Sequence, residues 1–207
     1  MLSQFDESFL FKNALVLVDH GDHDLALNLF DTILQENANH QEALHWKGYC
    51  HSQMGQTEKA ISAFNKVAEL SPTENNLFNL AEALYSAGQD DLAKQFYVRT
   101  LEQIDYESPH LFQIYKKMGN LSTKAGDFES AEEFYNKAYT IMPNSDDLYV
   151  NYGTLEIQRG NYDLAIERFK HALSLNSNND KAWVGLSLIY RERGDSELSW
   201  GELLHAL

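Results

Sequence analysis

The stretch that decides the fold covers residues 126–172 and reads GDFESAEEFYNKAYTIMPNSDDLYVNYGTLEIQRGNYDLAIERFKHA. Gly126 and Gly160 stand 34 residues apart in it, and each is followed by alanine after five residues, an aromatic residue after nine and alanine after twelve. These followers are Ala131, Tyr135, Ala138, Ala165, Phe169 and Ala172. Steps of three, four and seven place residues on one face of a helix. The stretch therefore predicts helices that repeat in phase after a glycine turn.

The same period runs through the whole chain. Six glycines mark it at spacings of 34, 33, 38, 34 and 34 residues: Gly21, Gly55, Gly88, Gly126, Gly160 and Gly194. Small residues recur seven before and five after each glycine, and large apolar or aromatic residues recur eleven before and nine after it. The pattern predicts antiparallel helix pairs, because small residues permit close approach, large ones fill the space beside them and glycine forms the turn.

On these residues the chain resembles the tetratricopeptide repeat family. The fourth and fifth units show this best, with Tyr115 and Gly119, and then Tyr149 and Gly153, ahead of their turn glycines. The resemblance implies an all-α fold, a right-handed superhelical solenoid of antiparallel helix pairs, as a single domain over residues 1–207. Six repeats are expected at about residues 7–40, 41–73, 74–111, 112–145, 146–179 and 180–207.

Two irregularities interrupt this pattern. The 38-residue step places about four extra residues within 101–110, just before or at Pro109. They indicate either a second helix one turn longer, which Pro109 ends, or a change of superhelical pitch between repeats 1–3 and 4–6. At the other end, no further amphipathic helix follows the second helix of repeat six. Trp200, Leu203 and Leu204 are therefore expected to be exposed and covered by a partner, a second copy or a downstream domain.

Composition and charge exclude several classes of protein. The 207 residues hold 31 acidic and 16 basic side chains, a formal net charge of −15, which argues against binding to nucleic acid or to an anionic membrane surface. One cysteine and three prolines exclude a disulfide scaffold and a Pro-rich stalk. The N-terminus lacks the basic start of a secretion signal, and no apolar run is long enough for a membrane span. A cytoplasmic protein is expected.

Catalytic and metal-binding motifs are absent from the sequence. No G-x-S-x-G, P-loop, G-x-G-x-x-G or H-E-x-x-H occurs, so we expect neither an enzyme nor a cofactor. Cys50 takes a packing position of repeat two and is expected to be a small buried hydrophobe rather than a nucleophile. His20 and His23, with the neighbouring aspartates, could hold a metal, but their place in a turn favours solvated polar side chains. No metal is expected.

The resemblance implies a concave groove lined by the first helix of each repeat, where a partner's extended peptide or helix binds. The groove-facing residues expected to contact the partner are Tyr49, Phe78, Glu82, Tyr85, Lys116, Asn120, Lys124, Asn151, Lys181 and Arg191. Apolar and polar neighbours such as Val150, Thr154 and Leu188 share these positions. The expected groove is aromatic in its N-terminal half and basic in its C-terminal half, so it can orient an acidic segment.

Part of the basic C-terminal half of the expected groove resembles the carboxylate clamp of tetratricopeptide co-chaperones, which binds an acidic C-terminus. Its first four places are filled by Lys116, Asn120, Asn151 and Lys181, but Gly185 stands where an arginine is expected. Loss of one charge-assisted bond costs about 1.5–3 kcal/mol. Arg191 is a possible substitute, and the alternative is a set of generic groove residues without a clamp.

We therefore expect a non-enzymatic scaffold or adaptor that binds a peptide or helix of another protein, an acidic C-terminal segment among the candidates. Two alternatives remain open. The chain could be the recognition or regulatory region of a larger enzyme whose catalytic domain follows Leu207, or a scaffold that forms homo-oligomers through its uncapped C-terminal end.

Overall fold

The computed structural model describes residues 4–105 and 107–194, and all regular structure within these two ranges is helical. The helices alternate with short turns and run in the order α1 (Gln4–Asp19), α2 (His23–Glu36), α3 (Gln41–Gln53), α4 (Thr57–Leu70), α5 (Glu74–Ser86), α6 (Asp90–Leu101), α7 (Leu111–Lys124), α8 (Phe128–Ile141), α9 (Asp146–Gln158), α10 (Tyr162–Leu175) and α11 (Asp180–Glu192). The predicted all-α fold of helix pairs is confirmed.

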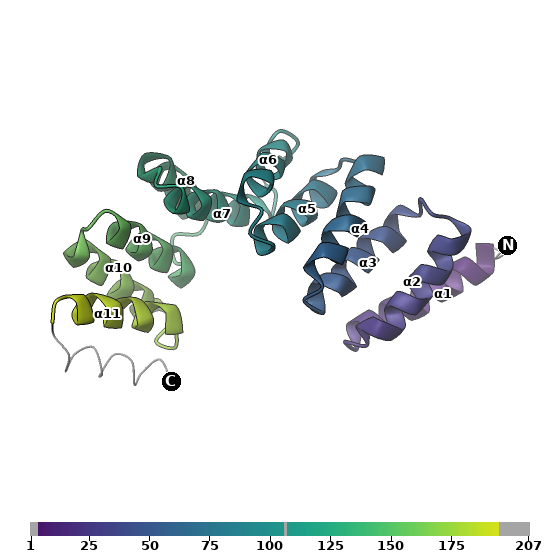
Figure 1. The fold of residues 1–207 in the computed structure, drawn as a ribbon, viewed down its shortest axis with the longest axis horizontal. Helices are drawn as coiled ribbons and strands as arrows, with labels where there is room; N and C mark the ends of the chain where they lie inside the picture. The colour runs from purple at the N-terminus through teal and green to yellow at the C-terminus, as the bar shows by residue number, and fades with distance from the viewer. Residues whose placement is uncertain (1–3, 106, 195–207) are drawn as a thin grey trace. The chain divides into compact units, whose positions relative to one another are not determined.

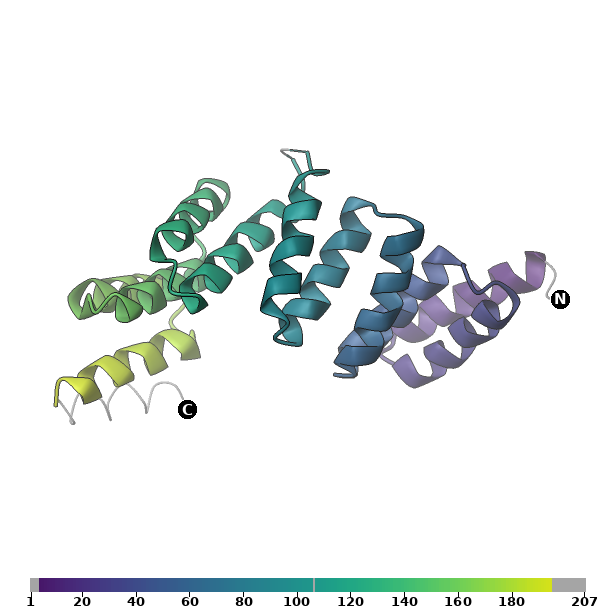
Figure 2. The ribbon, with the colours of Figure 1, turned by 45° about the horizontal axis from the view of Figure 1, so that its top comes forward.

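The chain divides into two compact units, Met1–Asp105 and Tyr106–Leu207, here called unit 1 and unit 2. In unit 1, α1 packs on α2, α3 on α4 and α5 on α6, and successive pairs meet through α2 with α3 and α4 with α5 (Figure 1). In unit 2, α7 pairs with α8 and α9 with α10, and α9 also contacts both α7 and α11 (Figure 2). First helices of unit 2 therefore lie side by side along one face of that unit.

The turn glycines close each pair as the repeat pattern predicts. All six have a positive φ, between 69° and 81°, a conformation that side chains with a Cβ rarely adopt. At Gly55, the N–H of Gln56 donates to His51 O at 2.8 Å and the N–H of Gly55 donates to Ser52 O at 3.0 Å. These two bonds form a Schellman motif, which satisfies the last carbonyls of α3 and turns the chain into α4.

A second kind of glycine, inside the first helices, makes room for the large residue of a second helix. Phe169 of α10 is 1% exposed and lies between Gly153 of α9 and Gly185 of α11. A Cβ built at Gly153 would lie 2.7 Å from Cε1 of Phe169, and one at Gly185 would lie 2.5 Å from its Cζ. The predicted complementarity of small and large residues is thus confirmed, and this ring joins two consecutive repeats.

The four extra residues of the 38-residue step do not lengthen a helix, so that interpretation is wrong. Helix α6 has 12 residues and ends at Leu101, while α7 begins at Leu111. The additional residues instead extend the connection, in which Ser108 Oγ accepts from the N–H of His110 at 3.1 Å. Helix is disfavoured there because Pro109 restricts the residue before it and lacks an N–H. A change of pitch between the halves stays a prediction. Trp200, Leu203 and Leu204 lie outside the described residues.

Candidate functional site

A pocket of about 520 Å³ opens in unit 2 where α9 and α11 lie beside each other over α10. Five of its lining residues occupy predicted groove positions: Val150, Asn151, Thr154, Lys181 and Leu188. The structure thus brings together Asn151 and Lys181, which were predicted from different repeats. The rest of the lining is Ile157, Gln158, Phe169, Asp180, Val184 and Gly185.

The floor and rim of this pocket are mainly apolar. Phe169 and Gly185 pack tightly against each other within it, and Val184 and Leu188 are each 42% exposed. These two side chains lie one turn apart on α11, so they form an apolar edge beside the hollow that an apolar group of another molecule can contact. The close contact also explains the missing clamp arginine, because any side chain at residue 185 would overlap the ring of Phe169.

Two lysines of the predicted clamp face a carboxylate of the chain itself. Lys116 Nζ lies 3.5 Å from Asp147 Oδ2, and Lys181 Nζ lies 3.8 Å from Asp147 Oδ1. Lys116 is only 12% exposed and also lies over the ring of Phe112 at 5.3 Å, whereas Lys181 is 77% exposed. An incoming carboxylate must therefore compete with Asp147 for both cations.

Asp147 was not among the predicted site residues, although a signal for it exists. It stands in the first turn of α9, where acidic residues are common because they complement the helix dipole. The preference for acidic residues at a helix N-terminus would by itself account for Asp147, so the sequence gives no reason to expect an ion pair. The repeat register nevertheless places Asp147 between Lys116 of α7 and Lys181 of α11.

Asn120 is held by the core of its own repeat. Its Oδ1 accepts from the hydroxyl of Tyr135 at 2.9 Å, and that hydroxyl also lies 3.0 Å from Thr123 Oγ1. Because Tyr135 is 1% exposed, the orientation of the Asn120 amide is fixed from inside the repeat. The remaining two basic residues, Lys124 and Arg191, are exposed near the ends of α7 and α11 and do not line the pocket.

The same arrangement recurs in unit 1 with a charged acceptor. Glu82 of α5 accepts a short hydrogen bond from the hydroxyl of Tyr97, and it stands six residues before its turn glycine, as Asn120 does. Burial, reinforced by the neighbouring Glu82, raises the pKa of the Tyr97 phenol, so it stays a donor. The sequence signal for this contact is a tyrosine nine residues after the turn glycine together with a polar residue six residues before that glycine.

The aromatic residues predicted in unit 1 lie on two first helices. Tyr49 of α3 is 37% exposed, with ring contacts to Trp46 at 5.4 Å and His23 at 6.2 Å. Phe78 and Tyr85 of α5 are half-buried, and the Phe78 ring lies 6.5 Å from that of Tyr97. Tyr49 is therefore the most accessible of these three aromatic side chains.

The chemistry available elsewhere in the described residues is limited. Cys50 is fully buried, and burial raises the pKa of its thiol to about 11, which confirms it as a packing residue. Within 4–105 and 107–194, no group of three histidine, cysteine or acidic side chains could hold a metal ion. Among the same residues, no helix combines the length and apolar character that a membrane crossing requires.

Comparisons with known proteins agree with the repeat pattern. Three family models described as tetratricopeptide repeat match the chain, one at residues 17–77 and 122–168, one at 72–144 and one at 153–203. The photosystem I assembly protein Ycf3 of Prochlorococcus marinus (strain MIT 9303) is 29% identical over 91 residues, 44% of this chain and 53% of that protein. The chain thus spans about half the length of this curated relative.

Solved structures with the same fold include three proteins of low sequence identity. MamA is 21% identical with a TM-score of 0.72, covering 84% of this chain and 94% of that one. PilW, a type IV pilus biogenesis factor, is 15% identical with a TM-score of 0.80, covering 97% and 91%. YrrB, a repeat protein with an unusual peptide-binding site, is 17% identical with a TM-score of 0.70, covering 84% and 88%. At these identities the likeness shows the fold alone.

Proposed function

Since this chain belongs to the tetratricopeptide repeat family, we propose that it is a non-enzymatic scaffold that binds a segment of another protein in the pocket of unit 2. The observation that carries the proposal is the hollow of about 520 Å³ between the first helices α9 and α11, rimmed by exposed Val184 and Leu188. Such a hollow accommodates an apolar side chain of a partner, and burial of that side chain supplies the binding energy.

Charge around the pocket favours an apolar anchor over an acidic C-terminus. Lys116 and Lys181 are matched by two acids, Asp147 beside both of them and Asp180 in the lining. With these charges balanced, a ligand carboxylate gains little net attraction, and the arginine that would bind it bidentately is absent. Lys181 and Asn151 are then orienting groups that hydrogen-bond the partner's main chain rather than a clamp for its terminus.

The experiment begins with peptides selected from a random display library on the full chain. We expect the selected peptides to share a large apolar residue and to bind equally well with a free or an amidated C-terminus. Leu188→Asp should weaken their binding at least tenfold, because it places a charge in the pocket. The matched control is Leu175→Asp, since Leu175 is 39% exposed at the end of α10 and does not line the pocket.

Circular dichroism of both variants checks that each remains folded. Peptides that bind the Leu188→Asp variant as tightly as the parent protein would show that this pocket is not the working surface. Loss of binding on amidation would show instead that a carboxylate clamp operates despite Gly185.

A further inference from the structure

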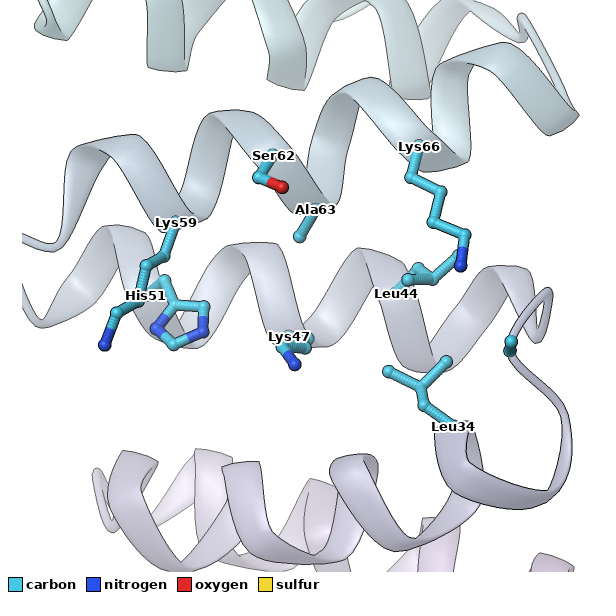
Figure 3. A pocket seen from close by; sticks show the side chains of 9 residues that line it. Leu34, Leu44, Lys47, His51, Lys59, Ser62, Ala63 and Lys66 are labelled. Carbon is cyan, nitrogen blue, oxygen red and sulfur yellow. The ribbon is translucent and has the colours of Figure 1, made fainter.

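A second pocket, of about 360 Å³, lies in unit 1 (Figure 3), and it is lined from α3 by residues other than the predicted groove residue Tyr49. At 3.6 residues per turn, Lys47 and His51 project from α3 roughly opposite to Tyr49. The pocket is bounded by the end of α2, by α3 and by α4, and its lining consists of Leu34, Ala38, Leu44, Lys47, His51, Lys59, Ser62, Ala63 and Lys66.

Positive charge is concentrated here in a unit that is acidic elsewhere. Residues 1–105 contain 16 acidic but only six basic side chains, and three of the six basic ones line this pocket. Lys47 Nζ pairs with Asp31 Oδ1 at 2.5 Å, while Lys59 Nζ donates to the amide oxygen of Gln56 at 3.1 Å. Lys66 has no ion pair within the described part of the chain. One acid against three lysines leaves a local excess of two positive charges.

The equivalent pocket three repeats later shows that packing does not require this excess. That pocket, about 330 Å³ in unit 2, uses the positions 105 residues further on, where Tyr152 stands for Lys47 and Leu164 for Lys59. Its lining holds two cations, Arg159 and Arg168, and two acids balance them: Glu132 and Glu156, which pair with Arg159 at 2.7 Å and 3.1 Å. The same architecture thus accepts aromatic, apolar or charge-balanced side chains, and the lysines of unit 1 call for an explanation outside packing.

The polar groups that line the unit 1 pocket are mainly donors. The three ammonium groups donate and cannot accept, whereas the Nδ1–H of His51 is already directed to the amide oxygen of Gln56 at 3.0 Å and the Ser62 hydroxyl can do either. A peptide main chain placed here would bring N–H groups with few acceptors to meet, and those groups would lose their hydration without replacement. The pocket therefore suits a ligand rich in acceptors and poor in donors.

The spacing of the lysines sets the shape of that ligand. Lys59 and Lys66 stand seven residues apart on α4, about 10 Å along the helix axis, and Figure 3 shows both extending toward the side where Lys47 lies. A single small anion cannot contact both ends of such a row. We propose that this pocket binds an oligophosphate, a chain of linked phosphate groups such as inorganic tripolyphosphate or the triphosphate of a nucleotide.

The apolar part of the lining is compatible with either source. Leu34 is half-buried and offers an apolar contact for a nucleoside beside the nearly buried Leu44 and Ala63, while inorganic tripolyphosphate would use the lysines alone. The site lies in unit 1, whereas the proposed function uses the pocket of unit 2, so the two do not depend on each other. Binding here leaves Tyr49 accessible.

The test is calorimetric titration of the full chain with tripolyphosphate in low-salt, magnesium-free buffer. Lys59→Gln combined with Lys66→Gln should weaken binding by about tenfold or more, because each lysine supplies a charge-assisted contact. The matched control combines Lys12→Gln with Lys94→Gln, which removes the same charge from exposed positions of unit 1 outside the pocket, and should change the affinity less than about threefold. Affinity should fall as salt is raised.

Parallel titrations with adenosine triphosphate and hexaglutamate distinguish the ligands. Tighter binding of the nucleotide than of tripolyphosphate would support the proposal with a nucleotide as the source, and equal binding would support the bare phosphate chain. Equal losses in the pocket and control variants would overturn it, because the attraction would then be non-specific. Binding of hexaglutamate through the same lysines, with none of tripolyphosphate, would overturn it in favour of an acidic peptide.

Discussion

The ring of Phe169 in α10 contacts Gly153 of α9 on one side and Gly185 of α11 on the other. The substitution Gly185→Ala tests whether the contact with Gly185 holds α11 against α10. An alanine Cβ at residue 185 would lie 2.5 Å from Cζ of Phe169 and 2.7 Å from its Cε1 and Cε2 atoms. These atoms form the far edge of the Phe169 ring. The ring is 1% exposed and also touches Gly153 of α9, so it has little room to move.

Two opposing effects set the magnitude. Overpacking a core costs about 1–3 kcal/mol, whereas alanine in place of glycine inside a helix gains about 1 kcal/mol. We expect Gly185→Ala to lower the free energy of unfolding by up to about 2 kcal/mol. In a Phe169→Leu background the ring edge is missing, so Gly185→Ala should raise that free energy by up to about 1 kcal/mol. The coupling between the two sites is then about 1–3 kcal/mol.

The assay is urea unfolding of the parent, both single variants and the double variant, followed by circular dichroism. Hydrogen exchange of the α11 amides in the same four proteins localises the change to this helix. Effects that add to within about 0.5 kcal/mol would refute the reasoning, because residues in contact should not behave independently.

Two further predictions concern polar contacts of unit 2. Arg159→Ala should lower the free energy of unfolding by about 1–3 kcal/mol in urea unfolding, because Glu156, whose side chain is 7% exposed, then keeps only the hydrogen bond from Asn161 at 2.8 Å. A loss below about 0.5 kcal/mol would contradict this. Burial alone would raise the pKa of Asp146, but hydrogen bonds from Asn179 and Asn176 outweigh it and hold that pKa below its usual value. The stabilisation from Asp146 is therefore present above the unfolded pKa of about 4 and is lost as the pH falls through the lower folded pKa. Asp146→Ala should cost about 1 kcal/mol at pH 7, and a cost that stays the same in urea unfolding at pH 2 would contradict the sign.

The helix pairs could be predicted because their determinants are local and repeated. Gly55 needs a positive φ to end α3, and Gly153 needs the absence of a Cβ to admit Phe169. Glycine at the turn, and glycine or another small residue seven positions before it, therefore recur in every repeat, whereas Gly185 stands at a position that the other repeats fill with larger residues. The connection 102–110 breaks the period, and of the two interpretations that the sequence allowed, the longer helix is wrong. Spacing alone cannot distinguish an additional helical turn from an additional loop, and only the placement of Pro109 and the end of α6 at Leu101 decides between them.

Parts of the candidate sites depend on contacts between residues of different repeats, which the sequence of one repeat does not predict. Asn151 and Lys181 could be grouped because groove positions follow the register, and they do line one pocket. Asp147 could not be assigned to the site from the sequence, because an acidic side chain is also common at a helix N-terminus. Its contacts with Lys116 and Lys181 arise only when α7, α9 and α11 lie side by side.

The lysines of the unit 1 pocket illustrate the same point more strongly. Lys47 lies on one helix, and Lys59 and Lys66 lie on the next, so in sequence each is an ordinary exposed residue of an amphipathic helix. Their convergence becomes informative only by comparison with positions 105 residues later, where Tyr152 and Leu164 fill the same architecture without an excess of charge. In a repeat protein, each unit is a natural control for the others. Residues shared by all units maintain the fold, and a cluster that appears in one unit alone is where a specific ligand should be sought.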